Sequence, residues 1–145
     1  MISHMELRKY EHITQYYETD QMGIIHHSNY IRWMEEARVN LLKQAGIAMT
    51  EIEKRGILIP VLSVNCEYRS MTRFGDTVVI ELRIKKYNGI KMHIEYEIRD
   101  KNTGELKACG SSTHCFLSKD GRLLSLKKNY PDIDAVFMKY MDSQG

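Results

Sequence analysis

No stretch of this sequence approaches the roughly 20 consecutive apolar residues that cross a bilayer, so a membrane span is not expected. Proline is scarce, with two residues beside nine glycines, which excludes a linker-rich or collagen-like chain. A strong charge of one sign is missing as well. The 21 basic and 19 acidic side chains leave a net charge of +2, which argues against a general nucleic-acid-binding protein.

The length of 145 residues is that of one ordinary domain, so residues 1–145 are expected to form a single domain. A chain of this size buries roughly 70% of its unfolded surface and needs no disulfide or metal to hold a core. The first ten residues are polar and lack the apolar stretch of a secretory signal. Because a second Met stands at position 5, residues 1–5 are expected to be a tag remnant or disordered.

Cysteine is present in the odd number of three, with no close pair at metal-ligand spacing. Cys66, Cys109 and Cys115 lie in apolar, strand-like segments and are predicted to be small core residues in a reducing cytosol. No basic neighbour is visible that would lower a thiol pKa, which disfavours a nucleophilic role. With no secretory signal, this predicts a cytoplasmic protein.

The clearest periodicity in the chain is helical. Apolar residues recur at spacings of four, three, four and four, which places them on one helical face: Tyr30, Met34, Ala37, Leu41 and Ala45. Ser28 or Asn29 can cap the start of this helix, and Gly46 suits its end. A second, short helix is predicted where Thr50 and Glu53 fit a capping box, with Gly56 ending it.

After Gly56 the apolar period changes from 3.6 to 2, which is typical of strands. Strands are predicted over 57–68, 80–85, 92–99 and 106–117, and residues 7–17 are expected to hold a first strand. Asn88-Gly89 is a strong hairpin signal, and further turns are expected at 102–104 and at Asp120-Gly121. The tail after Pro131 is weakly helical.

Strands without helices between them favour an antiparallel sheet, and the long helix must bury its apolar stripe against it. The predicted fold class is therefore α+β, with an antiparallel sheet wrapped around one long helix. A single helix covers one face only. The other face, or an edge strand, favours a homo-oligomer.

Residues 16–30 hold the groups that could carry chemistry. Asp20, a loop with Gly23, and the pair His26-His27 stand just before the helix start. The N-terminus of a helix presents unpaired N–H groups that can stabilise an oxyanion, and an adjacent carboxylate can attack or activate water. These groups suit acyl-transfer hydrolysis, although from spacing alone an Asp beside a turn is more often a turn or cap residue.

The same segment resembles a known family. Tyr17-Glu18-Thr19-Asp20, Gly23, His27, Asn29-Tyr30 and Glu36-Ala37-Arg38 look like the signature of hotdog-fold acyl-CoA thioesterases. These are the 4-hydroxybenzoyl-CoA thioesterase-like proteins, including the Tol-Pal-associated acyl-CoA thioesterases. The resemblance extends from about residue 10 to residue 117.

The resemblance implies a hotdog fold, a homodimer or homotetramer with continuous sheets, and hydrolysis of an acyl-CoA to a free acid and CoA. It makes Asp20 the catalytic nucleophile or general base, without choosing between the two. The backbone N–H of His27 would polarise the thioester carbonyl, and its imidazole could orient substrate or water. His26 stands where the Tol-Pal-associated branch has a tyrosine.

The expected substrate-binding residues are Tyr17, Gly23, His26 and Asn29, with Arg69 and Arg73 for the phosphates of CoA. No cofactor is implied. A metal is not expected either, because adjacent histidines on a helix point about 100° apart and no third ligand is evident. The alternatives are an acyl-carrier-protein thioesterase, a hydratase or dehydratase of the same fold, and a non-catalytic acyl-CoA-binding protein. The last has no need of a carboxylate at the thioester.

Overall fold

The computed structural model describes residues 7–144, so the tag remnant expected at residues 1–5 lies outside the described residues. In chain order the elements are β1 (Tyr10–Ile13), the 3-10 helix η1 (Tyr16–Glu18), α1 (Ser28–Gln44), α2 (Met49–Lys54), β2 (Ile57–Leu58), β3 (Val61–Tyr68), β4 (Thr77–Tyr87), β5 (Lys91–Asp100), β6 (Leu106–Cys115), β7 (Leu117–Ser118), α3 (Leu126–Asn129) and α4 (Pro131–Ser143).

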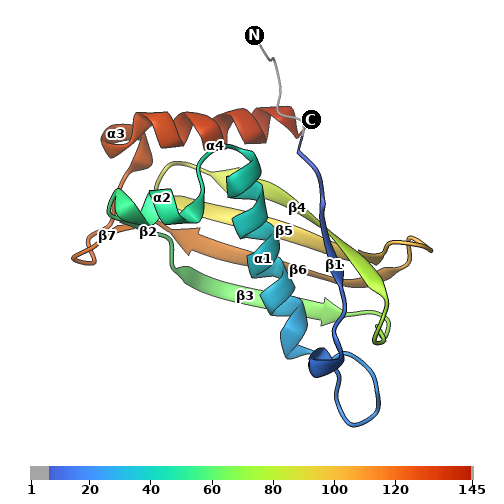
Figure 1. Cartoon of the computed structure of the whole chain (residues 1–145). Helices are drawn as coiled ribbons and strands as arrows, with labels where there is room; N and C mark the ends of the chain where they lie inside the picture. Colours follow the sequence, from blue (N-terminus) through green and yellow to red (C-terminus); the bar gives the residue numbers. More distant parts are fainter. Residues whose placement is uncertain (1–6, 145) are drawn as a thin grey trace.

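Five strands form one antiparallel sheet in the order β1-β4-β5-β6-β3, and β2 pairs with β7 in a separate ribbon (Figure 1). The predicted Asn88-Gly89 turn joins β4 to β5. Gly89 has a φ of +87°, and Oδ1 of Asn88 accepts hydrogen bonds from the N–H groups of Ile90 and Lys91. The hairpin signal in the sequence is therefore confirmed.

Helix α1 crosses one face of the sheet and buries the first three residues of the predicted stripe there, whereas Leu41 and Ala45 are half-buried and Ala45 lies just after the helix end. Tyr30, Met34 and Ala37 are buried, and Trp33 is fully enclosed beside them. The helix lies so close to the sheet that a Cβ at Gly110 of β6 would stand 2.8 Å from Cε of Met34. These contacts confirm the predicted α+β architecture of an antiparallel sheet around a long helix.

Several predicted boundaries were wrong. α1 has no side-chain cap from Ser28 or Asn29; instead Nδ1 of His26 accepts the Ser28 N–H at 3.2 Å. α2 starts at Met49 rather than after a Thr50 cap, because the Ala48 carbonyl already accepts the first helical N–H groups. The strand expected over 57–68 is interrupted before Val61, where Pro60 has no N–H to donate.

Other expected segments are shorter or longer than predicted. The first strand covers only 10–13 of residues 7–17, since the chain turns into η1, and the strand expected over 106–117 is divided into β6 and β7. The tail is a full helix of 13 residues, α4, whose Tyr140 hydroxyl donates to the Leu82 carbonyl of β4. α4 therefore covers the sheet together with α1.

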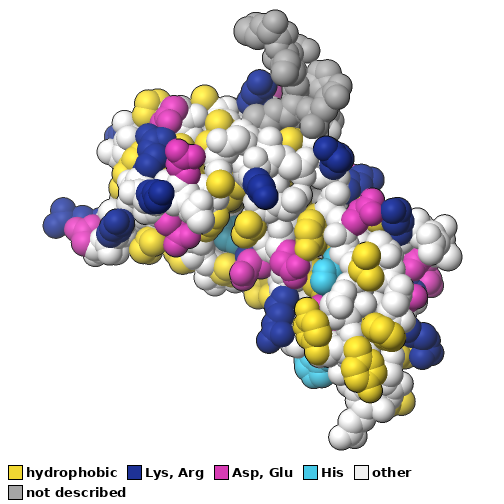
Figure 2. Space-filling view, in the orientation of Figure 1, with side chains coloured by type: hydrophobic (Ala, Val, Ile, Leu, Met, Phe, Trp, Pro, Cys, Tyr) yellow, Lys and Arg dark blue, Asp and Glu magenta, His cyan; other side chains and the backbone are white. Residues whose placement is uncertain are grey.

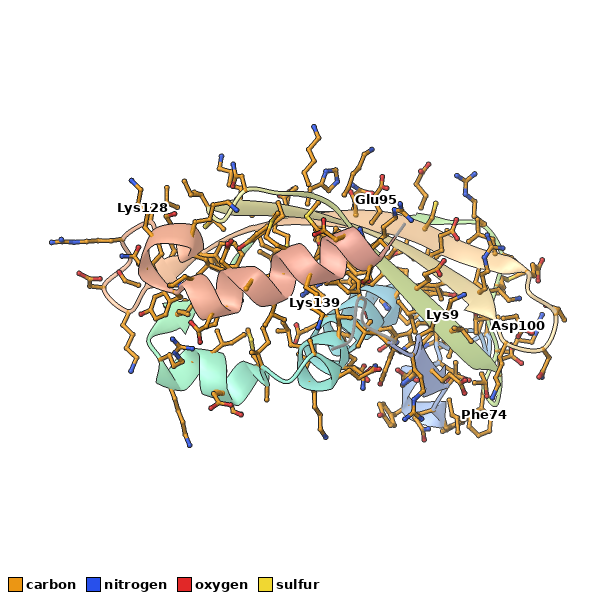
Figure 3. All side chains as sticks on the ribbon, turned by 90° about the horizontal axis from the view of Figure 1, so that it is seen from above. Lys9, Phe74, Glu95, Asp100, Lys128 and Lys139 are labelled. Atoms are coloured by element: carbon orange, nitrogen blue, oxygen red, sulfur yellow. The ribbon has the colours of Figure 1, made fainter. Side chains whose placement is uncertain are left out.

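The helices α1, α2 and α4 all lie on the same side of the sheet, and Glu95 projects from the uncovered side (Figure 3). Of the three cysteines, Cys115 is buried as predicted. Cys66 and Cys109 are only half-buried. Within residues 7–144, no helix has the length and hydropathy needed to cross a membrane.

Candidate active site

The candidate site lies where β1, η1 and the start of α1 meet. A tight loop follows η1: the Asp20 N–H donates to the Ile24 carbonyl at 2.8 Å, and Thr19 pairs with Ile25. Gly23 lies in this loop at a φ of +77°, a conformation that side chains disfavour. Ile24 and Ile25 then run beside Arg73 and Thr72, which anchors the loop to the segment before β4.

The Asp20 carboxylate is held at one oxygen. Its Oδ1 accepts the Met22 N–H at 2.8 Å and lies 3.4 Å from the Ile24 nitrogen. Among the described residues, the second oxygen has no hydrogen-bond partner. The residue is half-buried, so it is not enclosed in the core. Because Asp20 accepts the N–H of Met22, two residues further on, it also acts as the turn residue that the sequence offered as the alternative.

His27 immediately precedes α1 and has the backbone angles of a helical residue, with φ −57° and ψ −28°. Within the described part of the chain its N–H donates to no acceptor, whereas the neighbouring His26 N–H donates to Glu18 and the Asn29 N–H to the His26 carbonyl. The helix start therefore presents an unused donor beside the Asp20 loop, as an oxyanion site requires.

The imidazoles of His26 and His27 are exposed and stacked, with ring centroids 4.2 Å apart. Nδ1 of His26 lies 2.9 Å from the Ser28 hydroxyl, so this side chain shapes the helix start. The Tyr68 hydroxyl, at the end of β3, donates to the His27 carbonyl at 3.0 Å. Burial raises the pKa of Tyr68 to about 12, so the hydroxyl keeps its proton near neutral pH.

The other predicted site residues lie at different depths. Tyr17 is 81% exposed and belongs to an apolar surface around the loop that also includes Tyr16, Met22 and Phe74; Figure 2 shows hydrophobic side chains gathered at this end of the molecule. Asn29 is buried, and its amide donates to the carbonyls of Glu18 and His26. The Asn29 side chain therefore connects the two ends of the loop, at Glu18 and at His26.

The two predicted phosphate-binding arginines are exposed on the segment between β3 and β4. Arg73 follows Thr72 beside the Asp20 loop, whereas Arg69 lies at the end of β3 with Nη2 3.7 Å from the Cys109 sulfur. Among the described residues, no group of three or more His, Cys, Asp or Glu side chains could hold a metal ion.

Sequence reasoning missed Glu18 as a separate functional candidate. Its carboxylate is buried and accepts hydrogen bonds from His12 and Trp33, which come from β1 and α1. It also missed Tyr68 and Thr72, which contact the helix start and the loop. No local signal could have identified these residues, because each acts through a partner that is distant in the sequence.

A cavity of 330 Å³ lies along the second half of α1 and is mostly apolar. Its walls include Val39 and Leu42 of α1, Val61 at the start of β3, and His114 of β6. Arg38 and His114 also line this cavity, and a largely buried chain of hydrogen bonds connects them, from Arg38 to the Tyr96 hydroxyl at 2.9 Å, to Ser112 at 2.6 Å and to Nε2 of His114 at 2.8 Å.

Comparison with known proteins agrees with this geometry. The Thioesterase-like superfamily matches residues 14–139. YneP of Bacillus subtilis (strain 168), provisionally named an acyl-CoA thioesterase, is 36% identical over 136 residues, which cover 93% of this chain and 98% of that protein. The crystal structure of a DHNA-CoA thioesterase from Staphylococcus aureus is similar at a TM-score of 0.88 and 29% identity, covering 94% of this chain and 92% of that one.

A second structure, a hypothetical protein from Aquifex aeolicus, is similar at a TM-score of 0.80 and 26% identity, covering 88% of this chain and 97% of that one. The antiparallel sheet around a long helix, shared with these structures, is the hotdog fold, and the superfamily match together with these homologues shows that the protein is a thioester hydrolase. The chain belongs to the Thioesterase-like superfamily. The resemblance seen in the sequence is therefore confirmed for the fold and the superfamily.

Proposed function

We propose that this thioesterase hydrolyses an acyl-CoA thioester to a free acid and CoA at the Asp20 loop. The observation that carries the proposal is that two groups at this loop and helix start have no hydrogen-bond partner among the described residues: one carboxylate oxygen of Asp20 and the N–H of His27. The provisional name of YneP and the substrate of the Staphylococcus aureus structure support an acyl-CoA as the substrate class.

In this proposal the His27 N–H donates to the thioester carbonyl oxygen as negative charge develops there. The Asp20 carboxylate acts in one of two ways. As nucleophile it bonds to the carbonyl carbon and expels the CoA thiolate, and water then hydrolyses the resulting anhydride. As general base it takes a proton from the water that attacks the same carbon. Both routes consume one water and release one acid and one thiol.

We infer that the active form is a homodimer or a larger homo-oligomer built on β3. This strand pairs with β6 on one side and has an exposed edge on the other, where Val61, Leu62 and Val64 are exposed. An unprotected apolar edge favours pairing with another strand, and a second β3 is the self-complementary choice. We also propose that residues 1–145 form a single domain and that the protein is cytoplasmic.

Pairing of two β3 strands would make the site composite. One end of β3, at Tyr68, contacts the start of α1, while the other end, at Val61, lines the apolar cavity. Within one protomer the cavity at Arg38 lies about 15 Å along α1 from Ser28, at about 1.5 Å per residue. If two β3 strands pair antiparallel about their centre, the cavity of one protomer faces the helix start of the other. The acyl group would then occupy the partner's cavity.

The substrate side of the site follows the same proposal. Tyr17, Gly23 and His26 surround the thioester, while Arg73 and Arg69 offer charge to the CoA phosphates. Asn29 holds the loop that presents them. His27 keeps the histidine of the Tol-Pal-associated branch, which supports that branch, whereas His26 departs from it. A carrier-protein thioester is the alternative substrate, and binding of acyl-CoA without turnover is the alternative function.

A thiol-release assay with a panel of acyl-CoA and acyl-carrier-protein thioesters tests the proposal. The Asp20→Asn variant keeps an oxygen that can accept the Met22 N–H, so the loop should hold. Its turnover should fall by at least about 10²-fold, the low end for a base or nucleophile. Near-wild-type turnover in a folded Asp20→Asn variant would refute the role of Asp20, and binding without thiol release in the wild type would favour the non-catalytic alternative.

A further inference from the structure

Glu18 lies at the end of η1 and is only 4% exposed. Its Oε1 accepts the Gln15 N–H at 2.7 Å, and its Oε2 accepts the indole N–H of Trp33 at 2.8 Å. Nε2 of His12 lies between the two oxygens, at 2.9 and 3.1 Å. One buried carboxylate thus joins β1, η1 and α1.

Both oxygens of this carboxylate must act as acceptors. Burial by itself raises the pKa of Glu18, but the hydrogen bonds from His12, Gln15 and Trp33 together outweigh it, so the pKa lies below its ordinary value. Glu18 is therefore ionised near neutral pH. Each oxygen faces one N–H that cannot reverse its role, a backbone amide or an indole.

The backbone of Glu18 holds the ends of the loop that carries Asp20. Its carbonyl accepts the His26 N–H at 2.8 Å and the Asn29 amide at 2.9 Å. Asp20 follows only two residues later, and His27 follows His26. The side chain of Glu18 therefore anchors a carbonyl that sets how Asp20 approaches the helix start.

We propose that Glu18 is the positioning residue of this site: its buried carboxylate, bound by Gln15, His12 and Trp33, fixes the Asp20 loop against the start of α1. This inference rests on the proposed function of Asp20 and His27. A displacement of about 1 Å between reacting groups can cost about 10²-fold in rate. The carboxylate is needed for turnover, although it lies behind the loop that presents Asp20.

The Glu18→Gln variant tests this with almost no change in size. In either orientation, the introduced amide NH₂ faces the Gln15 N–H or the Trp33 N–H, and two donors oppose each other. We expect kcat to fall by about 10²-fold, the cost of a loop displaced by about 1 Å, with a smaller change in KM. The matched control is Glu36→Gln, which removes the carboxylate on the other side of His12, 3.7 Å from its Nδ1, and should leave kcat near wild type.

The double variant Glu18→Gln/Trp33→Phe separates positioning from general stability. Without the indole N–H, the introduced amide can turn its oxygen to the Gln15 N–H and its NH₂ to Nε2 of His12. In the other tautomer of His12 that nitrogen is an acceptor, so no two donors oppose each other. We expect kcat at least about tenfold above that of Glu18→Gln, about 1.4 kcal/mol of barrier, although the lost indole lowers the melting temperature further. A double variant no more active than Glu18→Gln would overturn the proposal.

Amide hydrogen exchange gives a second readout that needs no substrate. Exchange over residues 19–27 should accelerate in Glu18→Gln and slow again in the double variant, since the His26 N–H is held by Glu18. If the wild type hydrolyses no acyl-CoA but exchange follows this pattern, the proposed function fails and the positioning role stands. Unchanged exchange in Glu18→Gln would refute the role of Glu18.

Discussion

Protonation of His114 should destabilise the protein under mild acid. This side chain is 1% exposed, and its pKa is lowered from 6.5 to about 4, first by burial and second by the positive charge of Arg38. A hydrogen bond involving Pro60 works in the opposite direction without overcoming them. Nε2 of His114 lies 2.8 Å from the Ser112 hydroxyl, which suits a neutral ring that accepts that proton.

The sign follows from the two pKa values. Between about pH 6.5 and about pH 4 the unfolded chain binds a proton at His114 that the folded chain does not, so stability falls as the pH falls. One unit of pKa corresponds to about 1.4 kcal/mol. A pH of about 5 lies roughly 1.5 pH units below the ordinary histidine pKa, so the free energy of unfolding should be about 2 kcal/mol lower there than at about pH 7.5.

Urea unfolding of the wild type and of His114→Gln at these two pH values, with the protein concentration held fixed, measures this difference. The glutamine keeps an acceptor for Ser112 and cannot bind the proton. Its stability should therefore depend on pH less steeply, by about 2 kcal/mol over the interval. Equal losses in the two proteins would show that His114 is not held neutral by the fold, and the reasoning from burial and Arg38 would fail.

Two further predictions concern the assembly and the helix start. Val64→Lys places a charge at the centre of the β3 edge, so sedimentation should show a monomer and the thiol-release assay little turnover. The control Leu123→Lys alters another exposed aliphatic residue and should change neither the assembly nor the turnover. A fully active monomer would exclude the composite site. Proline suits the φ of −57° at this position, and both His27→Pro and His27→Ala lose the imidazole, but only His27→Pro also loses the unused N–H. His27→Pro should therefore lose roughly 10²-fold more turnover than His27→Ala, the low end for one oxyanion donor. Equal losses in the two folded variants would assign the effect to the imidazole.

The elements that the sequence predicted best are those whose signal is local. The 3.6-residue period of α1 and the Asn88-Gly89 turn both concern neighbours along the chain, and the helix and the turn were confirmed. Boundaries failed where a competing partner decided them. The start of α1 is shaped by the ring of His26 rather than by a hydroxyl of Ser28, and periodicity carries no information about such a choice.

The candidate site divides in the same way. Asp20 and His27 were found because the loop and the helix start adjoin in the sequence, so a short motif contains both. Glu18 belongs to the same motif, but its role depends on His12 and Trp33, which reach it from other elements. His114 lies on β6 in a chain of polar groups that ends at Arg38 of α1. Only the tertiary structure brings such partners together.

The contact between Tyr68 and His27 joins assembly to chemistry. Tyr68 ends the strand that we propose as the dimer edge, and its hydroxyl donates to the carbonyl of the residue whose N–H is the proposed oxyanion donor. A change in the pairing of β3 would therefore reach the helix start through one hydrogen bond, while Glu18 holds the Asp20 loop through β1 and α1. Because the two supports approach the site from different elements, a variant at β3 and a variant at Glu18 should impair turnover by separable routes.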